Sequence, residues 1–256
     1  MSLKPSWVQA ARLRGRKARK AGKVRFIGIS MHGQPDVLIK ALGQHDFDAV
    51  MTTINYYDRF NFPDIEDKLV PLANEKRAAI ILMKPLADGL LWKSPEQAFR
   101  YALGQDVSVV VTGINTREML ESDLRYVEQF VPMTQSEKEN LYDSAPELGS
   151  YVCRQCGKCL PCPEGLDIPA IFKCEGYFDR QMADGLITNT AEFALKERLR
   201  FWFGNGEYAS ARYGELDVKA DKCTKCGECL SRCPYGINIP RKLSIADYKV
   251  GGKKIY

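Results

Sequence analysis

Eight cysteines occur in two phrases that nearly repeat each other. Residues 151–169 read YVCRQCGKCLPCPEGLDIP, and residues 222–240 read KCTKCGECLSRCPYGINIP. Both contain Cys-x-x-Cys-Gly-x-Cys-Leu, then Cys-Pro-x-Gly and, two residues later, Ile-Pro. Thiolates at this spacing are typical ligands of metal centres. Because the pattern occurs twice, we interpret it as a repeated metal-binding motif.

The spacing within each phrase favours iron–sulfur clusters. Three cysteines separated by two residues can wrap three corners of a cubic cluster, and Gly157 and Gly227 let the backbone turn close to it. In the bacterial two-cluster pattern the fourth cysteine, which precedes a proline, binds the other cluster. The sequence therefore predicts two [4Fe-4S] clusters, one held by Cys153, Cys156, Cys159 and Cys233 and the other by Cys223, Cys226, Cys229 and Cys162.

Zinc and disulfides are the alternatives for these cysteines. Structural zinc also uses Cys-x2-Cys pairs, but it needs only four ligands, whereas each phrase offers a triplet plus a Cys-Pro. A disulfide framework would require a secreted chain. The first phrase has two residues before its last cysteine where the second has three, so Cys162 departs from the pattern. Cys174, the ninth cysteine, is expected to pack as a small apolar side chain.

The composition is that of a soluble globular protein with one large or two ordinary domains. The chain has 256 residues, of which 45% are hydrophobic and 27% charged. No apolar run approaches the roughly 18 residues of a membrane span, and the first residues lack the apolar region of a signal peptide, so we expect the cytoplasm. The net charge is +5. We interpret the basic segment 12–25 as a solvated helix face or a contact for an acidic partner. No aromatic residues interleave with its charges, so nucleic-acid binding is not expected.

Alternating elements fill the first half of the chain. We expect a first helix over residues 5–22, ended by Gly22. Gly43 is expected to stop a second helix, and Pro71 to interrupt a third. The predicted strands are 23–30, 47–57, 78–86 and 107–114, and the helices that follow them are 35–43, 63–76, 94–103 and 116–130. The last of these helices carries Leu120, Leu124 and Val127 along one side.

Strands that alternate with helices predict parallel βαβ units, and continuous apolar runs predict strands buried on both faces. After Pro132 we find no strand. A capping box, Thr134 to Glu137, opens a helix there, and another helix is expected over residues 191–203. The predicted domains are therefore an α/β domain, 1–132, and a mostly helical domain, 133–256, built around the cysteine phrases.

The first half resembles the C-terminal half of an aldo/keto reductase. The similarity is carried, in the family's order, by ARLRGRKARKAGKVRFIGISMHG, INYYDR, IILMKPLADGLL and VVVTGINTREMLESDL. Together with the cysteine phrases, the chain is similar to the ferredoxin-bearing branch of that family. The long spacer between the phrases resembles the α-helical ferredoxin modules of fumarate and heterodisulfide reductase subunits. The resemblance implies a partial (β/α)8 barrel of about four βα units.

The same resemblance implies sites for NAD(P)H and for catalysis. The family's catalytic tetrad belongs to the half that has no counterpart here. Four residues match positions that contact the cofactor in the family: Ser30, Gly113, Asn115 and Thr116. At four other such positions the usual side chain is replaced, here by Met31, Met51, Met119 and Asp123. Because these side chains are replaced, we expect this chain alone to bind NAD(P)H poorly. Candidates for catalysis past strand ends are His32, Tyr56 and Lys84; a hydrogen-bonded loop histidine and simple packing are the alternatives for the first two.

Four strands cannot close a barrel, so two sheet edges stay open. We expect a second copy of the chain or a partner protein to complete or cover the half-barrel. The predicted function is an iron–sulfur oxidoreductase component of aldo/keto reductase type, which relays single electrons through two clusters to or from a redox partner. The alternative is a non-catalytic electron-transfer or scaffold subunit whose half-barrel docks a partner.

Overall fold

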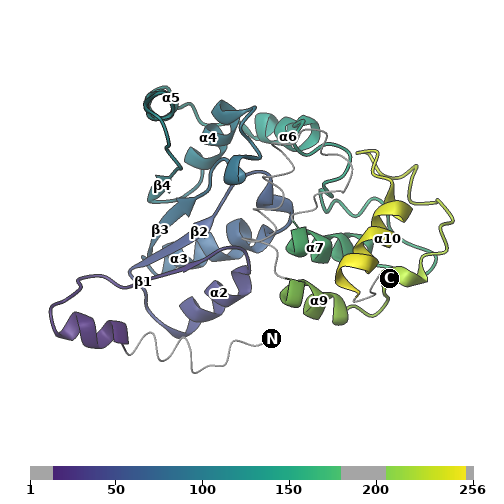
Figure 1. Cartoon of the computed structure of the whole chain (residues 1–256), viewed down its shortest axis with the longest axis horizontal. Coiled ribbons are helices and arrows are strands. Elements are labelled where there is room, and N and C mark those ends of the chain that lie inside the picture. Colours follow the sequence, from purple (N-terminus) through teal and green to yellow (C-terminus); the bar gives the residue numbers. More distant parts are fainter. Residues whose placement is uncertain (1–13, 180–205, 252–256) are drawn as a thin grey trace. The chain divides into compact units, whose positions relative to one another are not determined.

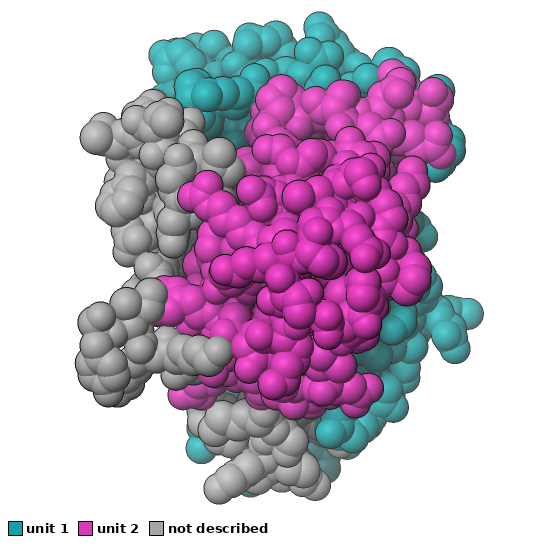
Figure 2. Space-filling model, turned by 90° about the vertical axis from the view of Figure 1, so that its right-hand side faces the viewer, with its two compact units in different colours: residues 1–135 teal, residues 136–256 magenta. Residues whose placement is uncertain are grey.

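The computed structural model describes residues 14–179 and 206–251 (Figure 1). The chain divides into two compact units, unit 1 with Met1–Gln135 and unit 2 with Ser136–Tyr256, which are coloured separately in Figure 2. The helix predicted over residues 191–203 lies outside the described residues, as does the beginning of the helix predicted over residues 5–22.

Unit 1 contains a parallel sheet of four strands in the order β1-β2-β3-β4 (Figure 1). Helices follow each strand, as the alternating sequence pattern predicted. The strands are β1 (Gly28–Met31), β2 (Ala49–Thr53), β3 (Ala79–Met83) and β4 (Val109–Val111). The main helices are α2 (Pro35–Gln44), α3 (Val70–Glu75), α4 (Pro95–Leu103) and α5 (Arg117–Glu128). This arrangement confirms the α/β class and the parallel strands.

Every strand is shorter than predicted, because an apolar run counts as a strand only where a neighbour pairs with it. At the start of β1, for example, the Ile27 N–H donates to the Asp48 carboxylate at 2.7 Å instead of joining a ladder. The ladder begins one residue later, where Gly28 lies opposite Ala49. The predicted strand over residues 23–30 is therefore wrong in its first half.

The inner and edge strands differ in burial. Val50 of β2 and Ile80 and Leu82 of β3 are almost fully buried and form the core. In β4, Val109 and Val111 remain 49% and 37% exposed. The prediction that all four strands are buried on both faces is wrong for β1 and β4, because each of these edge strands has a neighbour on one side only.

Helix α5 begins as predicted but does not bury its apolar side. The Thr116 hydroxyl accepts the Met119 N–H at 3.2 Å, which is a standard N-cap. Leu120, Leu124 and Val127 are 42%, 50% and 52% exposed, and no residue of α5 is buried. The predicted apolar side is therefore present and uncovered.

Glycine and proline mark the helix boundaries, with one exception. Gly22 has a φ of 68°, and the N–H groups of Gly22 and Lys23 close the preceding helix in a Schellman motif, which confirms the predicted cap. Gly43 lies inside α2, so the predicted stop there is wrong: the helical bonding continues to the His45 N–H. Pro71 follows a π-helical turn, Ile65–Leu69, which confirms the predicted interruption.

The regular elements in the described part of unit 2 are helices, and no strand is found there, as predicted. Its helices are α7 (Ile168–Asp179), α9 (Gly206–Gly214) and α10 (Ile239–Val250), and α6 (Gln135–Ser144) begins at the boundary between the units. Helices α7 and α10 pack against each other. A buried ion pair joins them, with Lys242 Nζ 2.5 Å from Glu175 Oε2. This pairing brings the segments that follow the two cysteine phrases side by side.

Candidate iron-sulfur centres

The eight phrase cysteines line two separate hollows in unit 2. We call them the first and the second hollow. The first is lined by Cys153, Cys156, Cys159 and Cys233, and the second by Cys223, Cys226, Cys229 and Cys162. The structure therefore brings together the two sets of four that the sequence suggested, with the fourth cysteine exchanged between the phrases. All nine cysteines are free thiols, so the disulfide alternative is wrong.

The two loops have the same backbone conformation. Gln155 and Gly157 have φ values of 56° and 71°, and Lys225 and Gly227 have 58° and 84°. The left-handed region is unfavourable for a residue with a side chain, so its use at matching positions marks a shape that both loops require. In the first loop the Gln155 N–H donates to Cys153 Sγ at 3.4 Å. Such donors stabilise the negative charge of a metal-bound sulfur.

Both phrases run directly into a helix that is capped in the same way. Before α7, Asp167 Oδ1 accepts the Ala170 N–H at 3.1 Å. Before α10, Asn238 Oδ1 accepts the Arg241 N–H at 3.2 Å. A carboxylate or amide cap followed by proline in the first turn is a strong helix start, so the repeated Ile-Pro encodes where each helix begins.

The beginnings of these helices form walls of the hollows. Ile168 lines both hollows, Pro169 and Ile239 line the first, and Pro240 lines the second. The N-terminus of a helix carries a partial positive charge and stabilises a negatively charged group beside it. A cluster with four thiolate ligands is such a group.

Burial sets the proton affinity of the thiols. Cys153 and Cys159 are 8% exposed and Cys229 is 7% exposed. Burial raises the pKa of Cys153 to about 12 and that of Cys159 to about 11, and it also raises the pKa of Cys229. Because metals bind the thiolate, loading the hollows would release protons. Cys156 and Cys226, by contrast, are exposed, so each hollow has an accessible side.

Each hollow also has an arginine in its wall, Arg154 in the first and Arg232 in the second. The Arg154 side chain is buried, and its guanidinium lies 4.5 Å from the centre of the Tyr235 ring. It donates to four backbone carbonyl groups at 2.6–3.2 Å, those of Tyr142, Leu148, Gly149 and Val152. Burial lowers the pKa of Arg154, but an arginine stays charged near neutral pH.

The donor sets fit cubic clusters. Four cysteine thiolates are the ligand set of a [4Fe-4S] cluster, which occupies a space between them. A zinc ion requires ligands that converge on one point at about 2.3 Å. Within residues 14–179 and 206–251, no group of three or more cysteine, histidine or acidic side chains converges in that way. The cysteines surround a space instead, as the larger group requires.

The cofactor candidates of unit 1 are not brought together. Ser30 is exposed at the end of β1, whereas Gly113, Asn115 and Thr116 are exposed after β4. Since β1 and β4 are the two edges of the sheet, three strand spacings, or about 14 Å, separate these positions. The Thr116 hydroxyl serves as the cap of α5.

The three candidates for catalysis in unit 1 differ in burial and in the residues that they contact. Tyr56 is fully buried and packs edge-on against Tyr101, with ring centres 6.0 Å apart. Lys84 Nζ lies 2.7 Å from Asp88 Oδ1. His32 follows β1 and is half-buried. The buried Tyr56 ring is part of the core, so its hydroxyl is not presented at the surface of this chain.

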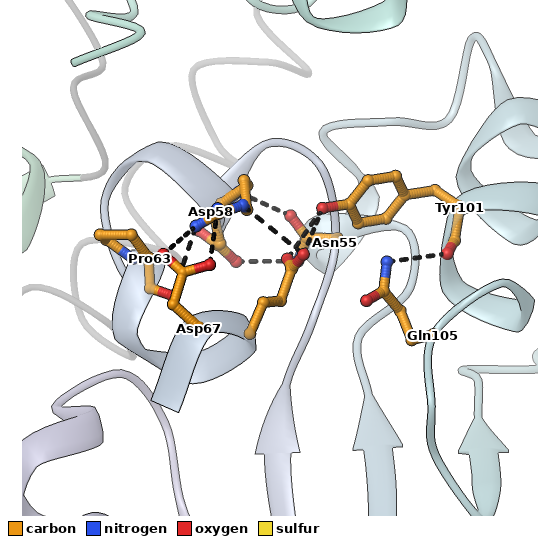
Figure 3. Close-up of polar contacts among 8 residues, drawn as sticks. Asn55, Asp58, Pro63, Asp67, Tyr101 and Gln105 are labelled. Carbon is orange, nitrogen blue, oxygen red and sulfur yellow. Dashed lines mark hydrogen bonds and ion pairs between the residues drawn. The ribbon is translucent and has the colours of Figure 1, made fainter. Parts of the chain in front are cut away.

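A polar network past β2 and β3 was not foreseen from the sequence (Figure 3). Asn55 Nδ2 donates to Asp58 Oδ2 at 2.8 Å and to the Lys84 carbonyl at 3.1 Å. Asn55 therefore ties the loop after β2 to the loop after β3. The sequence signal was slight, since one asparagine after a strand has many possible partners.

The same region contains a second group of charged contacts, which the close-up also draws (Figure 3). The Tyr101 hydroxyl donates to the Glu66 carboxylate at 2.8 Å, and Arg59 Nη2 lies 2.8 Å from Asp67 Oδ1. Burial lowers the pKa of Arg59, but Glu66 and Asp67 outweigh it and raise the pKa above its ordinary value. These contacts fix the loops at the ends of the inner strands.

Comparison with known proteins agrees with the prediction that the cysteine phrases bind iron–sulfur clusters. Residues 152–238 match the model of a family described as the 4Fe-4S dicluster domain. This match confirms the predicted iron–sulfur character of unit 2. No curated protein sequence matches the chain.

Two solved structures are similar to part of the chain. Both are of an aldo-keto reductase from Bacillus halodurans, in its holo and apo forms, each with a TM-score of 0.41 and 20% identity. Each match covers 49% of this chain and 52% or 53% of the other. The chain thus spans about half the length of these structures. Within the part that the structure describes, no helix has the length and apolar character needed to cross a membrane.

Proposed function

We propose that unit 2 holds two [4Fe-4S] clusters, each bound by three cysteines of one phrase and one of the other, and that the chain relays single electrons through them. The observation that carries this proposal is the pair of hollows, each lined by four cysteines drawn from both phrases. Bound clusters would supply one-electron redox chemistry. The residues of the chain hold them, shield them and set their charge environment.

The wall between the hollows supports electron transfer between the two groups. Ile168 lines both hollows and is 1% exposed, so one buried apolar side chain belongs to the walls of both. Phe172, Ile237 and Ile239 complete an apolar lining of the first hollow. An apolar lining excludes water and, with hydrogen bonds to sulfur, sets the reduction potential.

Each loop presents a place where a redox partner protein can approach. Cys156 and Cys226 are exposed, and the leucine that follows the third cysteine of each phrase is exposed as well. Leu160 is 37% exposed and Leu230 is 43% exposed. Exposed apolar side chains beside a redox centre are suited to brief contact with another protein.

For unit 1 we propose a role in an oxidoreductase of aldo/keto reductase type, with residues 1–132 as its domain and residues 133–256 as the cluster domain. The uncovered edge strand β4 and the exposed apolar side of α5 favour a second candidate, in which unit 1 docks a partner or a second copy of the chain. Sedimentation of purified protein tests the second of these, because a monodisperse monomer contradicts docking of a second copy. We further propose the cytoplasm as the site of action, since free thiols and iron–sulfur ligands persist in a reducing compartment.

Anaerobic purification tests the cluster proposal. We expect brown protein with about eight iron and about eight acid-labile sulfide atoms per chain, and an electron paramagnetic resonance signal after reduction with dithionite. Colourless protein without sulfide would overturn the proposal. Titration with NAD(P)H then separates the two candidate roles: bleaching by the nicotinamide supports the reductase, and bleaching only by a protein donor supports the non-catalytic subunit.

A further inference from the structure

The two phrases differ by one residue before the last cysteine. The first reads Leu160-Pro161-Cys162, and the second reads Leu230-Ser231-Arg232-Cys233. The shorter connection must still carry Cys162 into the second hollow. Arg232 comes from the longer connection and lies next to Cys233 of the first hollow, yet its side chain lines the second hollow.

Arg232 bridges the two connections. Its Nη1 donates to the Pro161 carbonyl oxygen at 3.0 Å, across 71 positions of sequence, and its Nε donates to the Glu228 carbonyl oxygen at 3.0 Å. Pro161 immediately precedes Cys162. The guanidinium therefore fastens the turn that carries Cys162 to the loop that carries Cys226 and Cys229.

The third nitrogen of the guanidinium donates no hydrogen bond within the described part of the chain. Arg232 Nη2 is buried and has no hydrogen-bond partner among the described residues. A buried donor without an acceptor is unfavourable, and a charged donor more so. The same hollow is lined by four cysteines, whose thiolates, like the sulfides of a cluster, carry negative charge and accept hydrogen bonds.

We propose that Arg232 is a positioning residue of the second centre. Nη1 holds the Cys162 turn, which compensates for the residue missing from the first phrase, and Nη2 donates to a sulfur atom of the cluster bound in the second hollow. This inference rests on the proposed function. It requires that loss of Arg232 affects the second cluster and spares the first, although Cys233, its sequence neighbour, belongs to the first hollow.

The experiment isolates each cluster in the full chain, purified anaerobically. Cys156→Ser should leave only the second cluster and Cys226→Ser only the first, each with about four iron atoms. Arg232→Met is then added to both backgrounds. We expect it to remove most iron from the Cys156→Ser protein, or to lower the midpoint potential of its cluster, and to leave the Cys226→Ser protein with unchanged iron and potential.

Two further variants complete the test. Arg241→Met removes an exposed arginine of the same unit and should change neither iron content nor potential. Arg232→Lys keeps the charge and a single donor group in place of the guanidinium fork, so it should retain iron but shift the potential of the second cluster alone. It also serves if the methionine variant does not fold. Unchanged iron and potential in the Cys156→Ser background, or loss of the first cluster, overturns the inference. Absence of iron and sulfide in the unsubstituted chain would instead overturn the proposed function.

Discussion

The loops around the two hollows are alike in backbone conformation at matching positions, but the charged side chains around the hollows differ. Both have left-handed residues at matching loop positions and an Asx-capped helix after the phrase. The first has the buried Arg154 against Tyr235, whose hydroxyl donates to Asp143 at 3.1 Å. The second has Arg232 and, at the position of Tyr235, Glu164. The repeated phrase therefore provides the same loop and helix start at each hollow. The residues that differ between the phrases give the two hollows different electrostatic surroundings.

The largest expected effect comes from breaking the exchange of fourth ligands. Cys233→Ser should reduce the iron content from about eight to about four atoms, because one cluster loses a ligand. If Cys233 serves the first hollow, adding Cys156→Ser removes nothing further. If it served its own phrase, the double variant would lose both clusters and retain almost no iron. Iron and sulfide analysis of the two proteins distinguishes these outcomes, with Cys174→Ser as the control that keeps about eight atoms.

Arg154→Met should destabilise the protein by about 3 kcal/mol, because it removes the guanidinium donor of four carbonyl groups in buried or part-buried positions. The measurement is unfolding by denaturant, followed by circular dichroism. Arg241→Met, which removes an exposed guanidinium, should cost less than about 0.5 kcal/mol. Equal stability of the two variants would show that the guanidinium of Arg154 does not organise the first hollow.

A smaller effect is expected on the potentials of the two centres. Each hollow has one arginine in its wall, Arg154 or Arg232, whose positive charge favours the reduced, more negative form of a cluster. Among the described residues, only the second hollow is also lined by a carboxylate, that of Glu164, which disfavours the reduced form there. The first cluster should therefore have the higher midpoint potential. Glu164→Gln should raise the lower potential and bring the two closer in a redox titration. A wider gap in the variant would contradict this assignment of charges.

The smallest effect concerns Cys174, the cysteine outside the phrases. Burial raises its thiol pKa from 9.0 to about 11, so at pH 8 its thiolate fraction is about 100-fold below that of an ordinary thiol. Alkylation by iodoacetamide at pH 8 should be slower by at least that factor, and it should accelerate as the pH rises towards 11. Mass spectrometry of the cluster-loaded protein measures the rate. Rapid labelling at pH 8 would show that the side chain is not packed in the core.

Local signals in the sequence were sufficient for the elements that depend on near neighbours. Gly22 ends its helix, Thr116 caps α5 and Pro71 follows an interrupted helix, because caps and breaks are set within one turn. Gly43 shows the limit of this reasoning: the helical bonds of α2 continue past it. The strand ends were overestimated for a related reason, since an apolar run does not say where a neighbour begins to pair.

The sequence by itself determined the pattern on which the proposed chemistry rests, because residue type and short spacing are enough to specify two matching sets of cysteines and the helices that follow them. Tertiary structure decided which residues face those sets. Arg232 reaches Pro161 across 71 positions, Asn55 joins two strand ends, and β4 stays uncovered at an edge of the sheet. Contacts of this kind depend on how distant segments pack, and no local pattern of residues encodes that packing.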